Sequence, residues 1–293
     1  MSSLPQEVRI AVIGGSGLTQ LEGLTDLAEV MVETPFGLPS GPVSVGLLAG
    51  QRVAFLPRHG VGHRLNPSEI PFRANIYLLK MMGVERIVAV SAVGSLQPQY
   101  APSELVVPDQ FVDRTVGRVA TFFNDGIVAH ISFAKPICPQ LAACVADAGD
   151  RLGIRVHRGG TYLCIEGPAL STQAESRLFR SWGMDIIGMT NITEARLARE
   201  AEICYSTLAM VTDYDCWHPD HEFVTAEMVV QTMQRNLQNV RKILGQAIGE
   251  LARLPRQCDC GNALRHALMT APERITAAVK TRLAAILPSE CLR

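Results

Sequence analysis

Two carboxylates, Asp213 and Asp215, stand two positions apart directly after an apolar run at 203–211. The run is short, apolar and partly β-branched, which predicts a buried strand. Acids at the carboxyl end of such a strand face the crevice in which open α/β sheets bind ligands. In continued extended structure the two side chains would share a face, where they could accept hydrogen bonds from a ring N–H and an exocyclic amine. A solvated loop with turn-forming aspartates is the open alternative.

Polar groups also follow other predicted strands, at the point where each strand ends. They are hydroxyl, guanidinium, imidazole and backbone N–H donors, which suit an anion with several oxygens. They are Ser16, Arg58, His59, Ser91 with the following backbone N–H of Ala92, and Thr190. We expect these donors to gather around one phosphate ion beside the two aspartates. Taken singly, each has a plainer interpretation, such as a surface arginine beside a structural histidine.

The glycine-rich turn at 14–17 could bring backbone N–H groups close to an anion. It is not a dinucleotide fingerprint, because Gln20 stands at the third glycine position of the frame that begins at Gly15. A nucleotide-dependent oxidoreductase that uses this turn is a rival hypothesis, against which Gln20 counts, and a plain tight turn is a further alternative.

A second turn, at 166–171, lies between a predicted strand and a predicted helix. In it Leu170 could cover a flat ring, and Ser171 could cap the helix that follows.

The chain has 293 residues, of which 47% are hydrophobic and 19% charged, and this predicts a globular fold with a sizeable core. Its net charge of −1 gives no long-range attraction to nucleic acid or anionic lipid. Residues 1–7 lack the features of a secretory signal, and no apolar run reaches the roughly 18 residues of a membrane span. We expect a cytoplasmic protein with a small-molecule partner, and no nucleic-acid or membrane partner.

Predicted strands alternate with predicted helices along the chain. We expect strands at 8–13, 43–48, 53–56, 86–90, 105–108, 161–165, 184–188 and 203–211, with 43–48 and 53–56 antiparallel. We expect helices at 71–82, 141–152, 172–182, 193–201, 263–269 and 277–286, and a long amphipathic helix capped by Thr225. The fold class is α/β: a single domain with a mixed twisted central β-sheet flanked by helices on both faces, and a helical C-terminal extension.

The chain contains eight cysteines. Six are scattered, and we interpret them as reduced, buried and inert thiols. Cys258 and Cys260 enclose a single residue, a spacing that matches neither a zinc knuckle nor the redox C-x-x-C pattern. A disulfide between them would close a small, strained ring. We therefore predict no metal site.

Eight motifs, in order over roughly residues 8–250, carry a resemblance to a known family. The longest are Asp-Gln-Phe-Val-Asp-Arg-Thr at 109–115 and Thr-Asp-Tyr-Asp-Cys-Trp at 212–217, and the others lie at 13–18, 34–37, 58–60, 71–76, 94–96 and 165–168. Together they resemble the trimeric purine nucleoside phosphorylase superfamily and, within it, the 5′-methylthioadenosine phosphorylase family. The C-x-C sequence at 258–260 is also similar to the tail of some members.

The resemblance implies a fold, an activity and a set of residue roles. Residues 1–255 would form the catalytic domain, and 256–293 a helical extension packed on it. The reaction would be phosphorolysis of 5′-methylthioadenosine by inorganic phosphate, in a homotrimer or hexamer without metal or organic cofactor. Phosphate would bind at Ser16, Arg58, His59, Ser91, Ala92 and Thr190. Around the nucleoside, Met189 would contact the ribose, Leu170 and Ser171 the purine, Asp213 N7 and Asp215 the 6-amino group.

The 5′ substituent of the nucleoside would be met by His130 of a neighbouring subunit and by the region 224–228. Ala169 and Leu170 stand where the family usually has Arg-Phe, which leaves a phosphorylase for 5′-methylthioinosine or for general purine nucleosides as an alternative. A non-catalytic purine-binding protein is a third possibility, against which the presence of Arg58, His59 and Asp213 argues.

Overall fold

The computed structural model describes residues 8–219 and 225–292, in which eleven strands form one mixed sheet. The strands are β1 (Ile10–Gly14), β2 (Thr25–Val30), β3 (Val43–Leu48), β4 (Gln51–Pro57), β5 (Arg86–Ser95), β6 (Leu105–Val107), β7 (Gln110–Arg114), β8 (Val156–Arg158), β9 (Thr161–Ile165), β10 (Ile186–Gly188) and β11 (Cys204–Asp213). The helices are α1 (Phe72–Met81), α2 (Pro139–Arg151), α3 (Gln173–Ser181), α4 (Asn191–Glu200), α5 (Ala226–Leu251), α6 (Ala277–Arg282) and α7 (Ser289–Leu292), with 3₁₀ helices η1 (Ser16–Thr19), η2 (Asp259–Asn262) and η3 (Pro272–Arg274).

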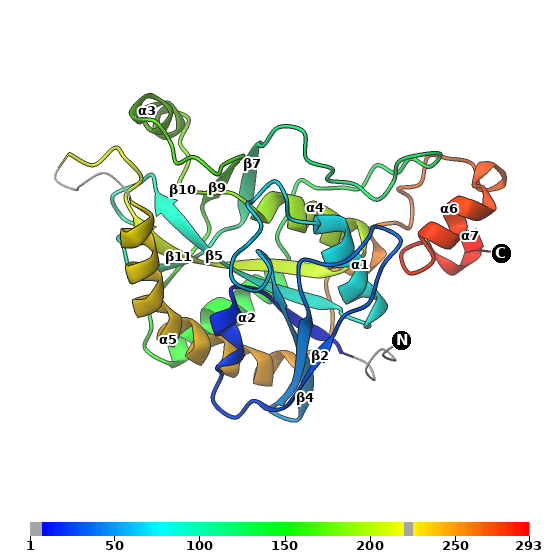
Figure 1. The fold of residues 1–293 in the computed structure, drawn as a ribbon, viewed down its shortest axis with the longest axis horizontal. Coiled ribbons are helices and arrows are strands. Elements are labelled where there is room, and N and C mark those ends of the chain that lie inside the picture. Colours follow the sequence, from blue (N-terminus) through cyan, green and yellow to red (C-terminus); the bar gives the residue numbers. More distant parts are fainter. Residues whose placement is uncertain (1–7, 220–224, 293) are drawn as a thin grey trace.

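Strand β5 is the centre of the sheet (Figure 1). Its first half pairs in parallel with β1, nearly its whole length pairs in parallel with β11, and its last residues pair antiparallel with β10. The main path runs β2-β3-β4-β1-β5-β10-β9-β7, and β11, β6 and β8 branch from β5. The predicted antiparallel pair β3–β4 is confirmed. The carboxyl ends of β1, β4, β5 and β11 consequently point the same way.

Helices cover both faces of the sheet, as predicted. Alternate residues of β1 enter different cores: Ile10 and Val12 lie in the cluster with α2 and α5, and Ala11 and Ile13 in the cluster with α1 and α4. This period of two is what a pleated strand imposes. All of β11 is buried, because it is covered on both faces.

Most predicted elements exist, and their ends differ by a few residues. Thr225 caps α5, its hydroxyl accepting from the Met228 backbone N–H at 3.3 Å. Strands β2, β7 and β8 were missed because they are short or mostly solvent-facing, so an apolar pattern is absent. The helix predicted at 263–269 was wrong: the segment is a series of turns that ends in a bridge between Leu268 and Ala129.

The residues after α5 pack against the same core as α1. Leu264, Ile275, Val279 and Leu283 are buried with Phe122 of the long β7–α2 connection. Figure 1 shows α6 and α7 beside that connection, at one end of the molecule. Among the helices of the described ranges, none has the length and apolar content that crossing a bilayer requires.

Candidate active site

The ends of four strands meet where the sequence predicted a ligand. The backbone N–H of Arg58, just after β4, donates to the Gly14 carbonyl at the end of β1 at 3.0 Å. Its Nη1 donates to the Val90 carbonyl of β5 at 2.9 Å. Asp213 of β11 is in register with Gly94 of β5. Arg58 and Asp213 therefore lie against the same strand, four residues apart, which is about 13 Å at the usual rise per residue.

A buried carboxylate fixes the Arg58 guanidinium. Glu194, in the first turn of α4, accepts from Arg58 Nε, from Nη2 at 3.0 Å, and from the Tyr205 hydroxyl at 2.8 Å. Burial alone would lower the pKa of Arg58, but the charge and hydrogen bond of Glu194 raise it, and the net shift is upward. Arg58 is therefore a fixed, oriented cation.

The arginine keeps donors for a ligand. A guanidinium carries five N–H groups, and three of those of Arg58 are used by Glu194 and the Val90 carbonyl. Because Glu194 neutralises the charge, the pair contributes directed donors rather than a net positive field. The sequence analysis gave Glu194 no role, because it stands between Thr193 and Ala195 in a helix of mixed polar and apolar residues, where no local pattern marks a buried acid.

His59 lies beside Arg58, and its Nδ1 is 2.9 Å from the Leu65 carbonyl oxygen. Since a carbonyl only accepts, Nδ1 carries the proton and Nε2 of the neutral ring is an acceptor. The pKa of His59 is lowered to about 4, first by burial and then by the charges of Arg58 and of His63, whose ring stacks on it at 4.1 Å. The sequence predicted a donor here, whereas at neutral pH the ring presents an acceptor, which suits a protonated phosphate oxygen.

Two buried hydroxyls adjoin this cluster. Ser91 of β5 lies near the Tyr162 hydroxyl, yet its Oγ makes no hydrogen bond of standard geometry within the described residues. Ala92 follows it on β5 and is half-buried. Thr190 donates to Asn191 Oδ1 at 2.9 Å. Because buried polar atoms normally find a partner, the Ser91 hydroxyl is a group left for a ligand.

Asp213 is the last residue of β11 and is 9% exposed. Its Oδ2 accepts the Thr212 hydroxyl at 2.7 Å, and its Oδ1 accepts the backbone N–H of Asp215 at 2.8 Å. Burial raises the pKa of Asp213 to about 6, with a further rise from the charge of Asp215, against the lowering effect of those hydrogen bonds. This carboxyl holds a proton more readily than an exposed aspartate, as a general acid must.

Asp215 reaches the site by a different path from the predicted one. The strand ends at Asp213, and Asp215 has a φ of 51°, so the two side chains do not share a face of one extended strand. A tight turn folds Asp215 back instead. Its Oδ2 is buried and makes no hydrogen bond of standard geometry among the described residues. Burial raises the pKa of Asp215, and the nearby hydroxyls of Ser176 and Ser171 oppose that rise.

Gly94 makes room for the acidic pair. A Cβ atom on Gly94 would stand 2.8 Å from Asp213 Oδ1 and 3.0 Å from the Ile187 side chain. The absence of a side chain at Gly94 therefore lets the two aspartates pack directly against the backbone of β5.

The turn at 166–171 is fastened to the end of β10. Gly167 has a φ of 68°, and a Cβ there would stand 2.5 Å from Met189 Sδ. Arg118, which the sequence analysis did not single out, donates to the Met189 carbonyl and, at 2.7 Å, to the Glu166 carbonyl. In the same turn Leu170 is 46% exposed. The helix that follows is capped by Thr172, whose hydroxyl accepts from the Glu175 backbone N–H at 3.2 Å, so the predicted capping role of Ser171 was wrong.

The turn at 14–17 is likewise held in place. Ser16 begins η1, and its side chain lies outside the described part of the structure. Arg241 of α5 donates to the Gly17 carbonyl from Nε at 3.0 Å and from Nη2 at 2.7 Å. The turn leads into a 3₁₀ helix of four residues, so it lacks the α-helix N-terminus on which dinucleotide-binding proteins seat a pyrophosphate.

His130 lies in another part of the molecule, on the β7–α2 connection. It is exposed, and its backbone N–H donates to the Ala267 carbonyl at 2.8 Å. No described contact joins it to Arg58 or Asp213. Val224 of the region 224–228 lies outside the described residues.

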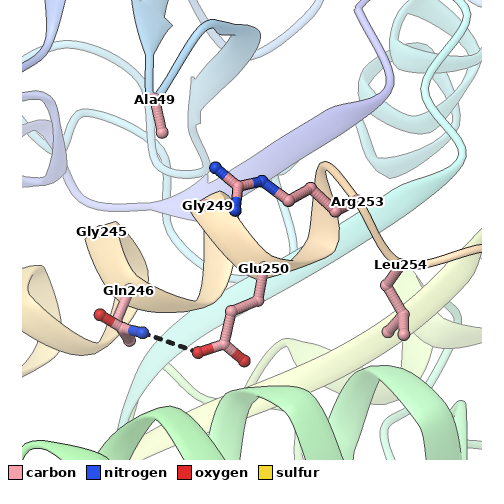
Figure 2. Close-up of a pocket in the computed structure, with 7 residues that line it drawn as sticks. All are labelled: Ala49, Gly245, Gln246, Gly249, Glu250, Arg253 and Leu254. Atoms are coloured by element: carbon pink, nitrogen blue, oxygen red, sulfur yellow. Dashed lines mark hydrogen bonds between the residues drawn. The ribbon is translucent and has the colours of Figure 1, made fainter.

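A hollow of about 540 Å³ lies between α5 and the β3–β4 turn, away from the site. Figure 2 shows Arg253 over it, and Gln246 donating to Glu250 along its rim. None of the predicted site residues is among its lining residues, Ala49, Gly245, Gln246, Gly249, Glu250, Arg253 and Leu254.

An arginine fixed by a buried carboxylate, the Ser91 hydroxyl and an acidic pair lie at one edge of the α/β sheet, and this arrangement suits an enzyme that acts on phosphate and a nitrogenous ring. The family model described as the phosphorylase superfamily matches residues 9–249. The chain belongs to this superfamily.

Two relatives of similar length carry the same name within this superfamily. The chain is 56% identical over 289 residues to the S-methyl-5′-thioadenosine phosphorylase of Gloeobacter violaceus, covering 97% of this chain and 96% of that protein. It is 53% identical over 281 residues to the protein of the same name from Koribacter versatilis, with 96% of both chains covered.

Solved structures agree. A methylthioadenosine phosphorylase from an antarctic soil metagenomic library superposes with a TM-score of 0.93 at 50% identity, over 97% of this chain and 100% of that chain. A mutant adenosine/methylthioadenosine phosphorylase from Schistosoma mansoni, in complex with methylthioadenosine, gives 0.82 at 32% identity, over 88% and 96%. The oxidoreductase hypothesis was therefore wrong.

Proposed function

We propose that this protein cleaves S-methyl-5′-thioadenosine with inorganic phosphate, giving adenine and 5-methylthioribose 1-phosphate. One observation carries the proposal: Arg58, which has spare donors, and the acidic pair both lie against the same strand, β5. Near-complete relatives of that name at 53–56% identity support it.

The phosphate would lie beside Arg58, within reach of Ser91 and the Ala92 backbone N–H. The spare guanidinium N–H groups and the unpartnered Ser91 hydroxyl supply donors. His59 would accept the remaining proton of hydrogen phosphate through Nε2. Thr190 and Ser16 complete the proposed set. Such fixed donors orient the nucleophile and hold its charge, which is a large part of the catalytic effect in phosphate chemistry.

In the reaction a phosphate oxygen forms a bond to C1′ while the bond from C1′ to the purine nitrogen breaks. The electron pair moves into the purine, which must gain a proton at N7 to leave as a neutral base. Asp213, with a pKa raised to about 6, would give that proton. Leu170 and Ser171 of the turn at 166–171, and Met189 at the end of β10, would contact the nucleoside; Arg118 holds these two segments together. No metal or organic cofactor takes part in these steps.

Asp215 would read the 6-position of the purine. Its Oδ2, which makes no hydrogen bond of standard geometry within the described residues, would accept from a 6-amino group. An ionised carboxylate facing the 6-oxo group of hypoxanthine leaves two acceptors in contact, a mismatch that costs about 1–3 kcal/mol or more.

A second candidate, cleavage of 6-oxopurine nucleosides, has one observation in its favour. The pKa of Asp215 is raised by burial, and a protonated Asp215 would donate to a 6-oxo group. The two candidates differ only in the protonation of this one carboxyl.

The proposed assembly is a homotrimer, in which His130 of the partner subunit meets the 5′ group. The exposed side chains of Val116, Val119 and Val128 lie on the same connection as His130. A cavity of about 290 Å³ beside Val116 and Val119 also touches Glu166 of the active-site turn. An apolar surface that adjoins an open site is a suitable place for a neighbouring subunit.

We also propose that residues 1–255 are the catalytic unit and that 256–293 are a helical extension packed on it. The family match to residues 9–249 and the packing of Leu264 and Val279 in the core of α1 support this division.

The test is a parallel assay of methylthioadenosine, methylthioinosine, adenosine and inosine, each with and without phosphate. We expect methylthioadenosine to give the highest kcat/KM, and free adenine to appear with a sugar 1-phosphate in equal amounts. Adenine release that does not depend on phosphate would mean a hydrolase, and faster release of hypoxanthine would favour the second candidate.

A further inference from the structure

Four cysteines from three separated parts of the chain lie close together at the amino-terminal end of strand β11. Cys138 precedes α2, Cys204 begins β11, Cys258 precedes η2 and Cys260 lies within it. The four sulfur atoms all lie within 4.8 Å of one another. Cys138, Cys204 and Cys260 are buried, with exposed fractions of 1%, 1% and 6%.

The sulfur spacing is that of a metal site rather than of a bonded pair. All four are free thiols, and the Cys204 and Cys258 sulfurs are 3.2 Å apart, well beyond the length of about 2.0 Å of a disulfide. Zinc bound by four thiolates has Zn–S bonds of about 2.3 Å, so sulfurs at the corners of the tetrahedron are about 3.8 Å apart. Small side-chain rotations would bring the four atoms to that spacing.

We propose that Cys138, Cys204, Cys258 and Cys260 form a structural site for one Zn²⁺ ion. Thiolates are soft ligands that select zinc over calcium or magnesium. With four protein ligands, no coordination position remains for water or substrate, and this is the mark of a structural rather than a catalytic zinc site. The proposal revises the prediction of no metal, which rested on the spacing of Cys258 and Cys260, on the interpretation of the other cysteines as inert thiols, and on the family resemblance.

Charge at the cluster also suits bound thiolates. Zinc with four thiolates carries a net charge of −2, which needs a nearby cation when buried. Arg256 supplies one: its Nε donates to Cys204 Sγ at 3.3 Å. Gly261 leaves space for the guanidinium, because a Cβ there would stand 2.9 Å from Arg256 Nη1.

The segment that delivers the last two ligands is fixed independently of them. Gln140, in the first turn of α2, donates to the Pro255 carbonyl at 2.9 Å and accepts from the Gln257 backbone N–H at 3.2 Å. Arg86 of β5 donates to the Leu254 carbonyl at 2.7 Å. The ligands are thus held close together before any ion binds, which reduces the ordering that binding must impose.

The site would join the C-terminal extension to the central sheet, far from the reaction. Cys204 and Asp213 are the first and last residues of β11, so about 30 Å of strand separates them. Loss of the ion should therefore lower stability and leave turnover unchanged.

The experiment measures metal content in the full-length protein, purified with a phosphine reductant and without chelator. We expect about one zinc per chain by elemental analysis. Co²⁺ added to chelator-treated protein should give the intense absorption of a tetrahedral four-thiolate site. Cys258→Ser and Cys260→Ser should each lose the zinc, melt at a lower temperature and keep the kcat of the parent. Cys144→Ser, at a buried thiol outside the cluster, is the matched control and should keep the zinc.

Two results would overturn the proposal. One is the reduced wild-type protein failing to retain Zn²⁺ or to give the Co²⁺ spectrum. The other is a protein purified without reductant that is free of zinc and lighter by the mass of four hydrogens, which means two disulfides. The wild-type measurements decide the matter even if a serine variant does not fold. Absence of zinc would leave the phosphorolysis assay unaffected, so failure of the two proposals can be told apart.

Discussion

The two ends of β11 carry two polar clusters that differ in chemistry and in completeness. At the carboxyl end, nitrogen and oxygen groups form paired charges, such as Arg58 with Glu194, and the nearby Ser91 hydroxyl makes no hydrogen bond of standard geometry within the described residues. At the amino end, four sulfurs lie within 4.8 Å of one another, and in the proposed zinc site they would fill all four coordination positions. The first cluster leaves groups free for a substrate, whereas the second would be closed by a single ion.

The two clusters also differ in what holds their side chains in position. The carboxyl-end groups sit on strand ends and are aimed by charged residues behind them, as Glu194 aims Arg58. The amino-end cysteines are placed by hydrogen bonds of neighbouring residues, as with Gln140. The comparison predicts that substitutions at one end change catalysis and that substitutions at the other change stability.

The largest effect is expected from Arg58→Ala. Removing the principal phosphate donor should lower kcat/KM for phosphate on the order of 10³-fold. It also leaves Glu194 buried and unpaired, which should cost about 3–5 kcal/mol of unfolding free energy. Steady-state kinetics and urea unfolding measure the two losses.

A double variant separates these two losses. Arg58→Ala with Glu194→Ala should regain much of the stability while activity stays low. Recovery of activity in the double variant would contradict the role given to the arginine.

Asp213→Asn should lower kcat by about 10²–10³-fold, because the purine then leaves without its proton donor. In the parent, kcat/KM should fall as the pH rises above about 6, where the acid form of Asp213 is lost in the free enzyme. The variant should lack that fall. A pH–rate profile of the variant that keeps the same basic limb would assign the limb to another group.

Asp213→Asn, which should lower activity, should raise the free energy of unfolding at neutral pH. The pKa of Asp213 is raised from 3.8 to about 6 in the folded protein, so its ionised form is the disfavoured one there. The parent should therefore lose about 3 kcal/mol of unfolding free energy as the pH rises from 3.8 to 6 and beyond. Asp213→Asn should remove this loss, measured by urea unfolding across that pH range.

A smaller change is expected from Asp215→Asn, which exchanges a carboxylate for a group that can donate or accept. The ratio of kcat/KM for methylthioadenosine over methylthioinosine should fall by about 10–100-fold, because the repulsion of the 6-oxo group is relieved. Total turnover of the preferred nucleoside should fall less than in Asp213→Asn. An unchanged ratio would place purine recognition elsewhere.

The smallest effect tests whether the two ends of β11 are independent. Cys258→Ser combined with Asp213→Asn should show the sum of the separate changes in unfolding free energy within about 0.5 kcal/mol, since sites so far apart rarely couple. A larger departure from additivity would show that the strand transmits strain between its ends.

The sequence by itself determined the α/β class, the position of most strands and helices, and the gathering of donors at the strand ends. Local patterns carry this information, because short apolar runs such as β1 indicate strands buried on both faces and a period of 3.6 indicates helices such as α5. The carboxyl ends of parallel strands then lie at one edge of the sheet, whatever the order of the strands along the chain.

Tertiary structure alone decided which groups are paired and which are left free. No pattern near Arg58 predicts its pairing with Glu194, which is 136 residues away. Likewise, no pattern near Cys258 predicts that Cys138 lies beside it. The turn that folds Asp215 back onto Asp213 was also outside the reach of a strand pattern. Pairing depends on distances between atoms from different elements, and those are set by packing of the whole chain rather than by its local sequence.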